Sequence, residues 1–374
     1  MLLKGNCLEL LAEMPDNSVD SIVTDPPYEL GFMGKSWDNS GIAYSVELWS
    51  QALRVLKPGG HLLAFGGSRT YHRLASAVED AGFEIRDQIM YLYGSGFPKS
   101  HNLKDEWQGW GTALKPAHEP IVVARKPLIG TVATNVLTYG TGALNIDGSR
   151  VETTEKLSIG SNNRQNALVN FGMKDNKETQ EQNLQGRWPA NVIHDGSEEV
   201  LEGFPNTKGV VRKPTGKGIL NPETGWNANS MIDTTVRGFA DEGSAARFFY
   251  CAKASKSERN AGLDIEQFPL KNYTEANKMG GAGDTMLTGS GNPRDSRKQN
   301  FHPTVKPIAL MRYLVKLVTP PNGTVLDPFL GSGTTAVAAI LEGFNWMGCE
   351  MTEDYWSIIE ARVAWAELQP KTLL

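Results

Sequence analysis

Several features are scarce in this chain, and each scarcity excludes a class of protein. Three cysteines in 374 residues provide neither a disulfide framework nor a metal cluster, which favours a reducing, cytoplasmic location. No apolar run approaches the roughly 18 residues that a membrane helix requires, and residues 1–5 turn polar too early for a signal peptide. The remaining composition, 40% hydrophobic and 21% charged, is typical of a soluble globular protein.

A basic excess is also missing, because the formal net charge is −5 at pH 7. Residues 128–301 hold 20 Lys and Arg against 20 Asp and Glu, whereas the rest of the chain holds 17 against 22. Nucleic-acid binding normally leaves a basic footprint on a domain. Any DNA-binding face of this chain must therefore be a local patch.

The residues Asp25-Pro26-Pro27-Tyr28 follow an apolar run, 21–24, that indicates a buried strand. Asp25 is thus expected at the carboxyl end of a strand, where open α/β sheets bind ligands. The two prolines fix the backbone and donate no N–H group, so nearby carbonyls are left to accept hydrogen bonds. If Asp25 and the Pro26 carbonyl accept both N–H groups of an aromatic amine, its nitrogen becomes a nucleophile, and Tyr28 can stack on the base. An ordinary proline-rich turn with a surface Asp is the alternative.

Strand and helix patterns alternate at both ends of the chain, which predicts a doubly wound α/β sheet. We expect strands at 1–4, 21–24, 61–65, 83–93, 120–124, 324–326 and 346–349, and helices at 7–14, 44–56, 71–80, 308–318, 334–341 and 355–368. Between 128 and 301, Gly, Asn, Thr and Ser are frequent and no long periodicity persists. Because so long a structureless stretch is improbable inside one compact domain, part of it should fold separately or become ordered on binding.

A second motif, the run from Asp327 to Thr334, joins a strand to a helix through Gly331 and Gly333. Such a turn lets backbone N–H groups approach a ligand at a helix N-terminus. A phosphate loop would need a Lys after the second glycine, and a dinucleotide site accepts the Ala336 that stands in place of a third glycine. Glu350, at the end of the following strand, is placed to bind ribose hydroxyls. The motif favours a nucleoside cofactor.

Both motifs together, with His302-Pro303-Thr304-Val305-Lys306-Pro307 before the second, resemble the β-class of S-adenosylmethionine-dependent DNA amino-methyltransferases of prokaryotic or phage type. In that family the methylation motif comes first, then a target-recognition region, then the cofactor motif. The resemblance implies a discontinuous catalytic domain at 1–127 and 302–374 and a target-recognition insert at 128–301. It also implies a mostly parallel, seven-stranded, Rossmann-like methyltransferase sheet, circularly permuted.

The resemblance also assigns roles to residues of both motifs. The catalytic residues it implies are Asp25, Pro26, Pro27 and Tyr28. The cofactor-binding residues it implies are Asn6, Cys7, Asp25, Thr304, Lys306, Asp327, Phe329, Gly331, Gly333, Thr334 and Glu350. Thr304 and Lys306 are expected at the approach to the cofactor carboxylate. Asn6 stands where many relatives have Asp, so we expect it to serve the adenine ring through its amide. No metal is needed, because transfer from a sulfonium to nitrogen depends on alignment.

The predicted reaction is methyl transfer from S-adenosylmethionine to the N6 amine of adenine in double-stranded DNA, with the nucleotide extruded from the duplex. Adenine follows from the family's common pairing of Asp with adenine and Ser with cytosine, and N4-cytosine methylation is the enzymatic alternative. A non-catalytic DNA-binding protein and an RNA or protein acceptor are further alternatives. The resemblance also suggests dimerisation. Neither the recognition sequence nor an accompanying restriction endonuclease can be read from these motifs.

Overall fold

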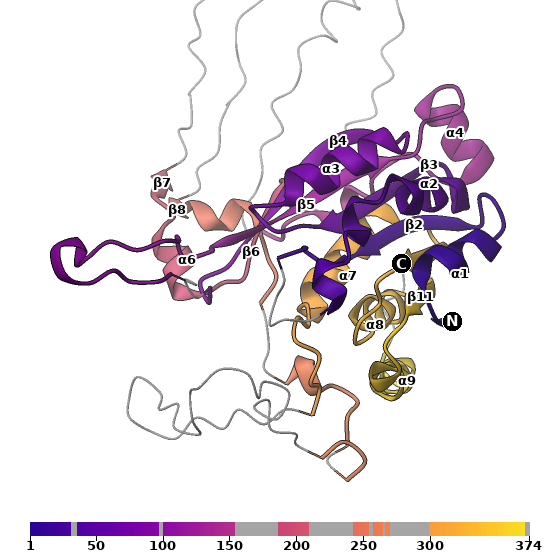
Figure 1. Ribbon diagram of the computed structural model, residues 1–374. Helices are drawn as coiled ribbons and strands as arrows, with labels where there is room; N and C mark the ends of the chain where they lie inside the picture. Colours follow the sequence, from indigo (N-terminus) through magenta and orange to yellow (C-terminus); the bar gives the residue numbers. More distant parts are fainter. Residues whose placement is uncertain are drawn as a thin grey trace, which may run out of the picture. The chain divides into compact units, whose positions relative to one another are not determined.

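The computed structural model describes residues 1–30, 36–96, 100–153, 186–208, 242–253, 257–264, 266–269 and 299–370 (Figure 1). The chain divides into two compact units. The first comprises Met1–Ser149, Asn191–Val200 and Cys251–Leu374, and the second comprises Arg150–Ala190 and Leu201–Tyr250. None of the helices in the described ranges is long and apolar enough to cross a membrane.

The larger sheet has nine strands in the order β1-β11-β10-β2-β3-β5-β4-β6-β9. The ladders from β1 through β11, β10 and β2 to β3 are parallel. By contrast, β5 is antiparallel to both of its neighbours, β3 and β4. The strand bounds are Leu2–Lys4 for β1, Val19–Thr24 for β2, Leu56–Phe65 for β3, Glu84–Leu92 for β4, His118–Arg125 for β5, Val192–His194 for β6, Tyr250–Cys251 for β9, Thr324–Asp327 for β10 and Asn345–Glu350 for β11.

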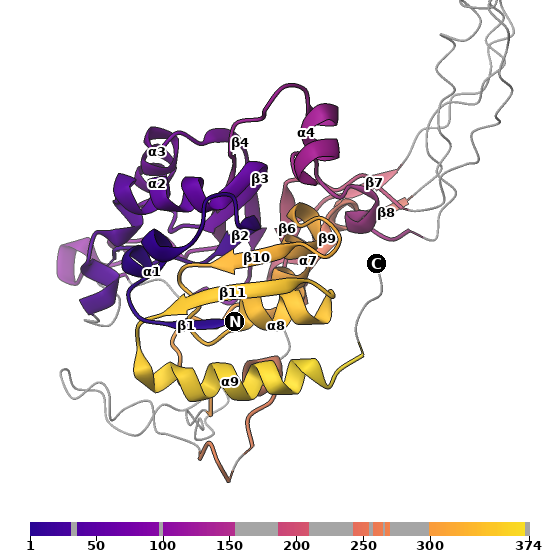
Figure 2. The same cartoon turned by 90° about the vertical axis from the view of Figure 1, so that its right-hand side faces the viewer.

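Helices cover both faces of this sheet, as a doubly wound architecture requires (Figures 1 and 2). On one face α1, α2 and α3 pack as a row, and on the other α7, α8 and α9 pack as a second row. The helix bounds are Cys7–Glu13 for α1, Val46–Val55 for α2, Tyr71–Asp80 for α3, Val132–Tyr139 for α4, Glu198–Glu202 for α6, Ile308–Val318 for α7, Thr334–Leu341 for α8 and Glu353–Glu367 for α9.

The hydrophobic core contains the apolar residues whose spacing predicted the helices. Leu11 of α1, Trp49 of α2 and Val78 of α3 are fully buried against Ile22 and Leu62 of the central strands. Each of these helices turns one apolar stripe to the sheet, as amphipathic helices do. The predicted doubly wound, mostly parallel α/β fold is confirmed.

The sheet is permuted as expected but wider than the seven strands predicted. Strand β10, from the C-terminal part of the chain, lies between β11 and β2. The prediction of seven strands was wrong because β4 is not the edge of the sheet. Strand β6 pairs with β4 in parallel, with Met90 opposite Val192 and Leu92 opposite His194. Three-residue strands of this kind are too short to carry a sequence pattern.

Strand β3 begins earlier than the sequence indicated. A helix at 44–56 and a strand at 61–65 were expected, yet β3 already starts at Leu56 and includes Lys57-Pro58-Gly59-Gly60. The register between β2 and β3 shifts between Val19 and Ser21, which accommodates an irregularity beside the proline and glycines. Proline in a strand is tolerated at such a bulge.

The boundaries of the two units differ from the predicted domain limits at 127 and 302. Residues 128–149, which include α4, group with the sheet because Asn135 is buried and donates to the carbonyls of Pro58 (2.8 Å) and Thr141 (2.7 Å). Within the second unit, β7 (Asn206–Lys208) and β8 (Glu242–Ser244) form an antiparallel pair. Target recognition by the insert stays a prediction.

Candidate active site

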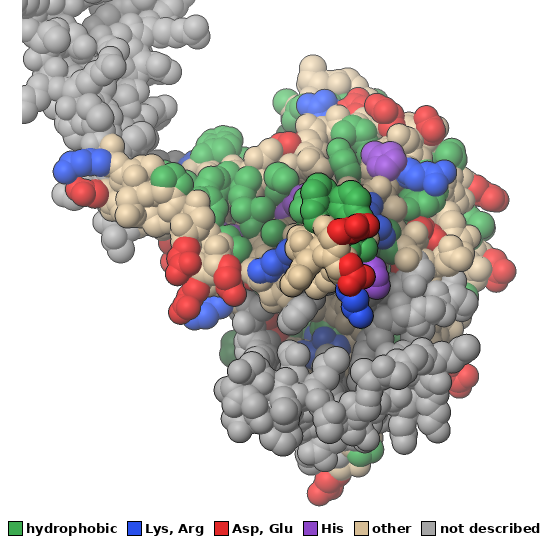
Figure 3. Space-filling view, turned by 60° about the vertical axis from the view of Figure 1, so that its left-hand side comes forward, with side chains coloured by type: hydrophobic (Ala, Val, Ile, Leu, Met, Phe, Trp, Pro, Cys, Tyr) green, Lys and Arg blue, Asp and Glu red, His purple; other side chains and the backbone are tan. Residues whose placement is uncertain are grey.

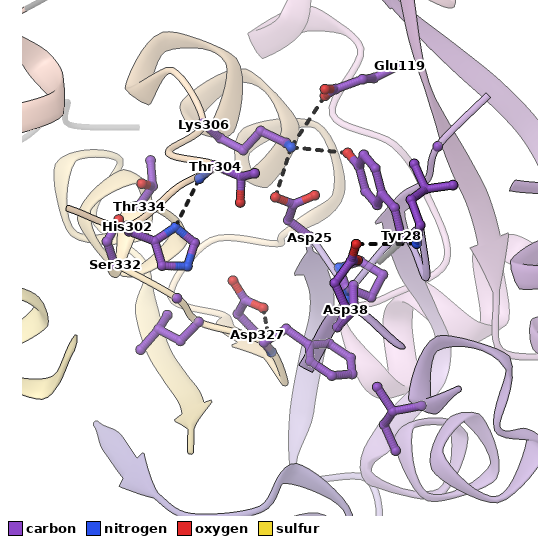
Figure 4. Close-up of a pocket in the computed structure, with 18 of the residues that line it drawn as sticks. Asp25, Tyr28, Asp38, Glu119, His302, Thr304, Lys306, Asp327, Ser332 and Thr334 are labelled. Carbon is purple, nitrogen blue, oxygen red and sulfur yellow. Dashed lines mark hydrogen bonds and ion pairs between the residues drawn. The ribbon is translucent and has the colours of Figure 1, made fainter. Parts of the chain in front are cut away.

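The parallel strands end at a single pocket of about 1010 Å³ in the first unit (Figure 4). Asp25 follows β2, Asp327 ends β10 and Glu350 ends β11, so three carboxylates meet at one sheet edge. This is where a doubly wound sheet binds ligands. The pocket contains every residue predicted for the site apart from Gly333; those lining it are Asn6, Cys7, Asp25, Pro26, Pro27, Tyr28, Thr304, Lys306, Asp327, Phe329, Gly331, Thr334 and Glu350.

The turn that follows β2 is fixed from outside. The Tyr28 carbonyl accepts hydrogen bonds from the Thr70 hydroxyl at 2.9 Å and from the Tyr44 hydroxyl at 3.4 Å. Gly67 lies close by, and a Cβ there would come within 3.3 Å of the Tyr28 ring. Together with the two prolines, these contacts hold the Asp25 carboxylate at the pocket wall.

The two oxygens of the Asp25 carboxylate have different surroundings. Oδ2 lies 2.8 Å from the Lys306 ammonium. Oδ1 is buried and has no hydrogen-bond partner among the described residues. Burial raises the pKa of Asp25, and the charge of Lys306 opposes that rise. A buried acceptor without a donor is costly, so Oδ1 is suited to receive an N–H group from a ligand.

The Lys306 ammonium lies between Asp25 and Glu119 and donates to the Tyr28 hydroxyl at 3.1 Å. Its expected place at the approach to the cofactor carboxylate stays a prediction. Lys306 directly precedes Pro307, which caps α7, and α7 packs beneath β2 and β3. Burial alone would lower the pKa of Lys306, but the two facing carboxylates raise it well above its usual range.

Asp327 fastens the glycine turn to the sheet. Its Oδ1 accepts from the Thr24 hydroxyl at 2.6 Å and from the Phe329 N–H at 3.0 Å, and its Oδ2 accepts from the Thr335 hydroxyl at 2.5 Å. Burial raises the pKa of Asp327 to about 6, against the pull of these donors. Because both oxygens already have protein partners, Asp327 mainly orders the turn that faces the pocket.

The two glycines of that turn have different functions. Both have positive φ, 56° at Gly331 and 83° at Gly333. A Cβ at Gly331 would lie 2.9 Å from His302 Nε2, so only glycine fits between the pocket and that ring. Gly333 precedes α8 and is absent from the lining that the described residues form; a Cβ there would meet Ile359 at 3.3 Å. Gly333 therefore serves backbone geometry and helix packing.

Glu350 and Asn6 also line the pocket. The Glu350 carboxylate accepts from the N–H groups of Gly331 (2.8 Å) and Thr352 (2.7 Å), and burial raises its pKa. The Asn6 side-chain oxygen accepts from the Leu8 N–H at 2.9 Å and caps α1. This leaves the Asn6 amide N–H groups for a ligand. Burial raises the pKa of the Cys7 thiol to about 11, so it is neutral.

Three residues of the site carried no predicted role. Glu119 contacts Lys306 at 3.3 Å, and His302 is a neutral ring whose pKa burial lowers to about 3. Arg362 of α9 is fully buried and donates to the Ser332 carbonyl at 2.7 Å, behind the glycine turn. An arginine on the apolar stripe of a helix is a usable signal for Arg362. Glu119 follows His118 at the start of β5, but its contact with Lys306 depends on β5 being antiparallel to β3.

Among the described residues, no group of three His, Cys, Asp or Glu side chains could hold a metal ion. The site offers hydrogen-bond acceptors, the buried Lys306 ammonium and neutral aromatic rings. Such a set can bind and orient a polar, partly aromatic ligand.

Comparison with known proteins identifies the family. The N6_N4_Mtase family model, described as DNA methylase, matches residues 19–361. The chain belongs to this family of DNA methylases. The match confirms the resemblance to the DNA amino-methyltransferases that the two motifs predicted.

Curated relatives match this chain over short segments. It is 44% identical to the putative methylase YubD of Escherichia coli (strain K12) over 63 residues, which is 17% of this chain and 28% of the relative. It is 40% identical to the type II methyltransferase M.ScaI of Streptomyces caespitosus over 74 residues, 20% of this chain and 24% of the relative. With M.HpaI of Haemophilus parainfluenzae the identity is 32% over 131 residues, 33% of this chain and 38% of the relative. The chain thus matches less than two fifths of each relative's length.

Two solved structures resemble this chain over nearly its whole length. M1.HpyAVI covers 97% of this chain and 98% of its own, with a TM-score of 0.42 and 15% identity. The PvuII DNA methyltransferase, which is cytosine-N4-specific, covers 100% of this chain and 87% of its own, with a TM-score of 0.48 and 15% identity. At these values neither neighbour bears on the target base.

Proposed function

We propose that this chain transfers a methyl group from S-adenosylmethionine to the N6 amine of adenine in duplex DNA. The observation that carries the proposal is the buried Oδ1 atom of Asp25, which has no partner among the described residues and borders the pocket next to the glycine turn. An acceptor there can take an N–H bond from an exocyclic amine and aim the nitrogen lone pair. Family membership supports DNA as the acceptor.

The residues around the glycine turn fit the methyl donor. S-adenosylmethionine supplies the methyl group on a positively charged sulfur. Each Glu350 oxygen accepts one backbone N–H and keeps a lone pair for a ribose hydroxyl. The Asn6 amide offers donors to an adenine ring, and Gly331 lets a ligand approach the backbone closely. The pocket volume lies at the upper end of the roughly 300–1,000 Å³ typical of small-molecule sites, which suits a donor and a base together.

We choose adenine because the first residue of the motif is Asp25. In the family that the chain resembles, Asp at this position commonly accompanies adenine as the target base. A carboxylate also accepts hydrogen bonds from the N4 amine of cytosine, so N4-cytosine methylation is the alternative. In both cases the amine is base-paired within the duplex, and the nucleotide must leave the stack before transfer. Identification of the methylated nucleoside separates the two bases.

A hairpin of residues 100–117 provides a surface for the duplex beside the pocket. Its return arm, 112–117, forms part of the pocket lining. Near its tip the rings of Trp107 and Trp110 meet edge to face at 5.5 Å, and 52% and 63% of these residues are exposed. Hydrophobic side chains gather on the side drawn in Figure 3, toward which this hairpin extends. Exposed aromatic rings stack on bases whatever the sequence.

The acceptor class is tested by incubating the protein with methyl-labelled S-adenosylmethionine and, separately, mixed-sequence duplex DNA, RNA and a protein mixture. We expect label in duplex DNA alone. Label in RNA or protein without label in DNA would refute the proposed substrate. DNA binding without any label would instead favour a non-catalytic DNA-binding protein.

A further inference from the structure

Lys306 is the centre of a buried cluster that extends beyond the predicted catalytic turn (Figure 4). Its ammonium lies 2.8 Å from Asp25 Oδ2, 3.3 Å from Glu119 Oε2 and 3.1 Å from the Tyr28 hydroxyl. The three charged side chains are only 10% (Lys306), 17% (Asp25) and 23% (Glu119) exposed. At such burial their charges are weakly screened by solvent.

The charge of this cluster depends on Glu119. Asp25 and Lys306 alone form a neutral pair, whereas the second carboxylate gives the three side chains one net negative charge. The Lys306 ammonium contacts both Asp25 and Glu119, so Asp25 is not its sole partner. Asp25 Oδ1 thus stays available to the pocket.

The phenols and the imidazole around Asp25 add no charge to the cluster. Burial raises the pKa of Tyr28 well above 10 and that of Tyr93 to about 12, so both phenols are neutral at pH 7. Burial lowers the pKa of His302 to about 3, so this ring is neutral as well. The Asp327 carboxylate also lies near Asp25, but its partners are Thr24, Thr335 and the Phe329 N–H, which hold it at the glycine turn and apart from Lys306.

The proposed reaction moves a positive charge toward this cluster. As the amine nitrogen forms its bond to the methyl carbon, the carbon–sulfur bond breaks and its electron pair stays on sulfur. The charge of the sulfonium therefore passes to the nitrogen, which afterwards loses one N–H proton to the Asp25 carboxylate. A fixed negative charge beside the nitrogen stabilises that transition state most where it is buried and preorganised.

We propose that Glu119 is a positioning residue of the methyl transfer, which holds Lys306 between two carboxylates and so keeps the cluster net negative opposite the reacting amine. This inference rests on the proposed function. Glu119 reaches the site because β5 runs antiparallel to β3, so the start of β5 lies at the edge where the parallel strands end.

The test compares Glu119→Gln with Glu119→Asp, using labelled methyl transfer to mixed-sequence duplex DNA. Glu84→Gln is the matched control, because Glu84 pairs with Arg125 at the other end of β5 (2.6 Å) and does not belong to the pocket. We expect Glu119→Gln to lower kcat on the order of 10- to 100-fold. Affinity for S-adenosylmethionine and the thermal unfolding midpoint should match those of Glu84→Gln, and Glu119→Asp should recover part of the rate.

The pH profile separates this role from simple damage to the site. The charge of Glu119 raises the pKa of Asp25, so its removal lowers that pKa and lets Asp25 stay ionised in more acidic solution. In Glu119→Gln, the acidic limb of the pH profile of kcat should therefore move to lower pH, although the maximum rate falls. In Glu119→Asp, this limb should return to the pH at which it lies in the unaltered protein. A merely structural role would lower the rate without moving the limb.

Two results have distinct meanings. If the unaltered protein methylates DNA and Glu119→Gln retains the rate and pH profile of Glu84→Gln, the role of Glu119 is refuted while the proposed function stands. If the unaltered protein labels no DNA, the proposed function itself fails.

Discussion

The Thr24 hydroxyl donates to Asp327 Oδ1 at 2.6 Å across 303 positions of sequence. Thr24 immediately precedes the turn Asp25-Pro26-Pro27-Tyr28, and Asp327 begins the glycine turn. This hydrogen bond between neighbouring strands β2 and β10 therefore fixes the two turns against each other at the edge of the pocket.

Replacement of Thr24 tests that link. Thr24→Val keeps the shape of the side chain but removes the donor, and a hydrogen bond to a charged group contributes about 1.5–3 kcal/mol. We expect the free energy of unfolding, measured by urea denaturation, to fall by about that amount. Thr24→Ser keeps the hydroxyl and serves as control. Equal stability of the valine and serine variants would contradict a structural role for this bond.

Asp327 should leave a signature in the pH dependence of stability. Its folded pKa of about 6 is above its unfolded value of roughly 3.9, so between these values the folded state binds more protons. The contribution of Asp327 to stability is therefore largest below pH 4 and declines as pH rises toward 6, by about 3 kcal/mol in total. Urea denaturation of the unaltered protein and Asp327→Asn from pH 4 to 7 should yield a stability difference that changes over this window. A constant difference would contradict the raised pKa.

Asn6 combines a structural role with a proposed ligand contact. Asn6→Ala removes the cap of α1 and should cost about 0.5–2 kcal/mol of stability. Asn6→Ser keeps a capping oxygen but has no amide to offer the adenine ring. We expect calorimetry to give weaker S-adenosylmethionine binding for both variants, with stability preserved only in the serine variant. Unchanged affinity in both would refute the contact.

The hairpin beside the pocket is expected to contribute to DNA binding and not to cofactor binding. Replacing Trp107 and Trp110 together by alanine should raise the KM for duplex DNA, since stacking on one aromatic ring contributes roughly 1–3 kcal/mol. Affinity for S-adenosylmethionine should not change. Leu137→Ala, at an α4 residue that is 89% exposed and lies outside the pocket lining, is the control. A KM equal to that of the control would exclude the hairpin from DNA binding.

Sequence patterns predicted the sheet because its core helices and strands are regular. The helices at 71–80, 308–318 and 334–341 have the predicted ends, since apolar stripes and stop signals define them locally. The start of β3 and the addition of β6 were not predictable in this way. Both depend on neighbouring strands that are distant in sequence.

The same distinction holds within the site. Short motifs located Asp25 and Gly331, because each motif forms one turn at a strand end. The two carboxylate partners of Lys306 were not predictable from the sequence. Asp25 lies 281 positions before Lys306, and Glu119 lies 187 positions before it. Contacts of that kind follow from strand order and direction.

The most direct measurement is nucleoside identification after the protein has acted on mixed-sequence duplex DNA with labelled S-adenosylmethionine, in parallel with Asp25→Ala. We predict N6-methyladenine from the unaltered protein, and no product from Asp25→Ala although its affinity for S-adenosylmethionine is retained. N4-methylcytosine would contradict the assignment of the base. Full activity of Asp25→Ala would contradict the central role of the Asp25 carboxylate.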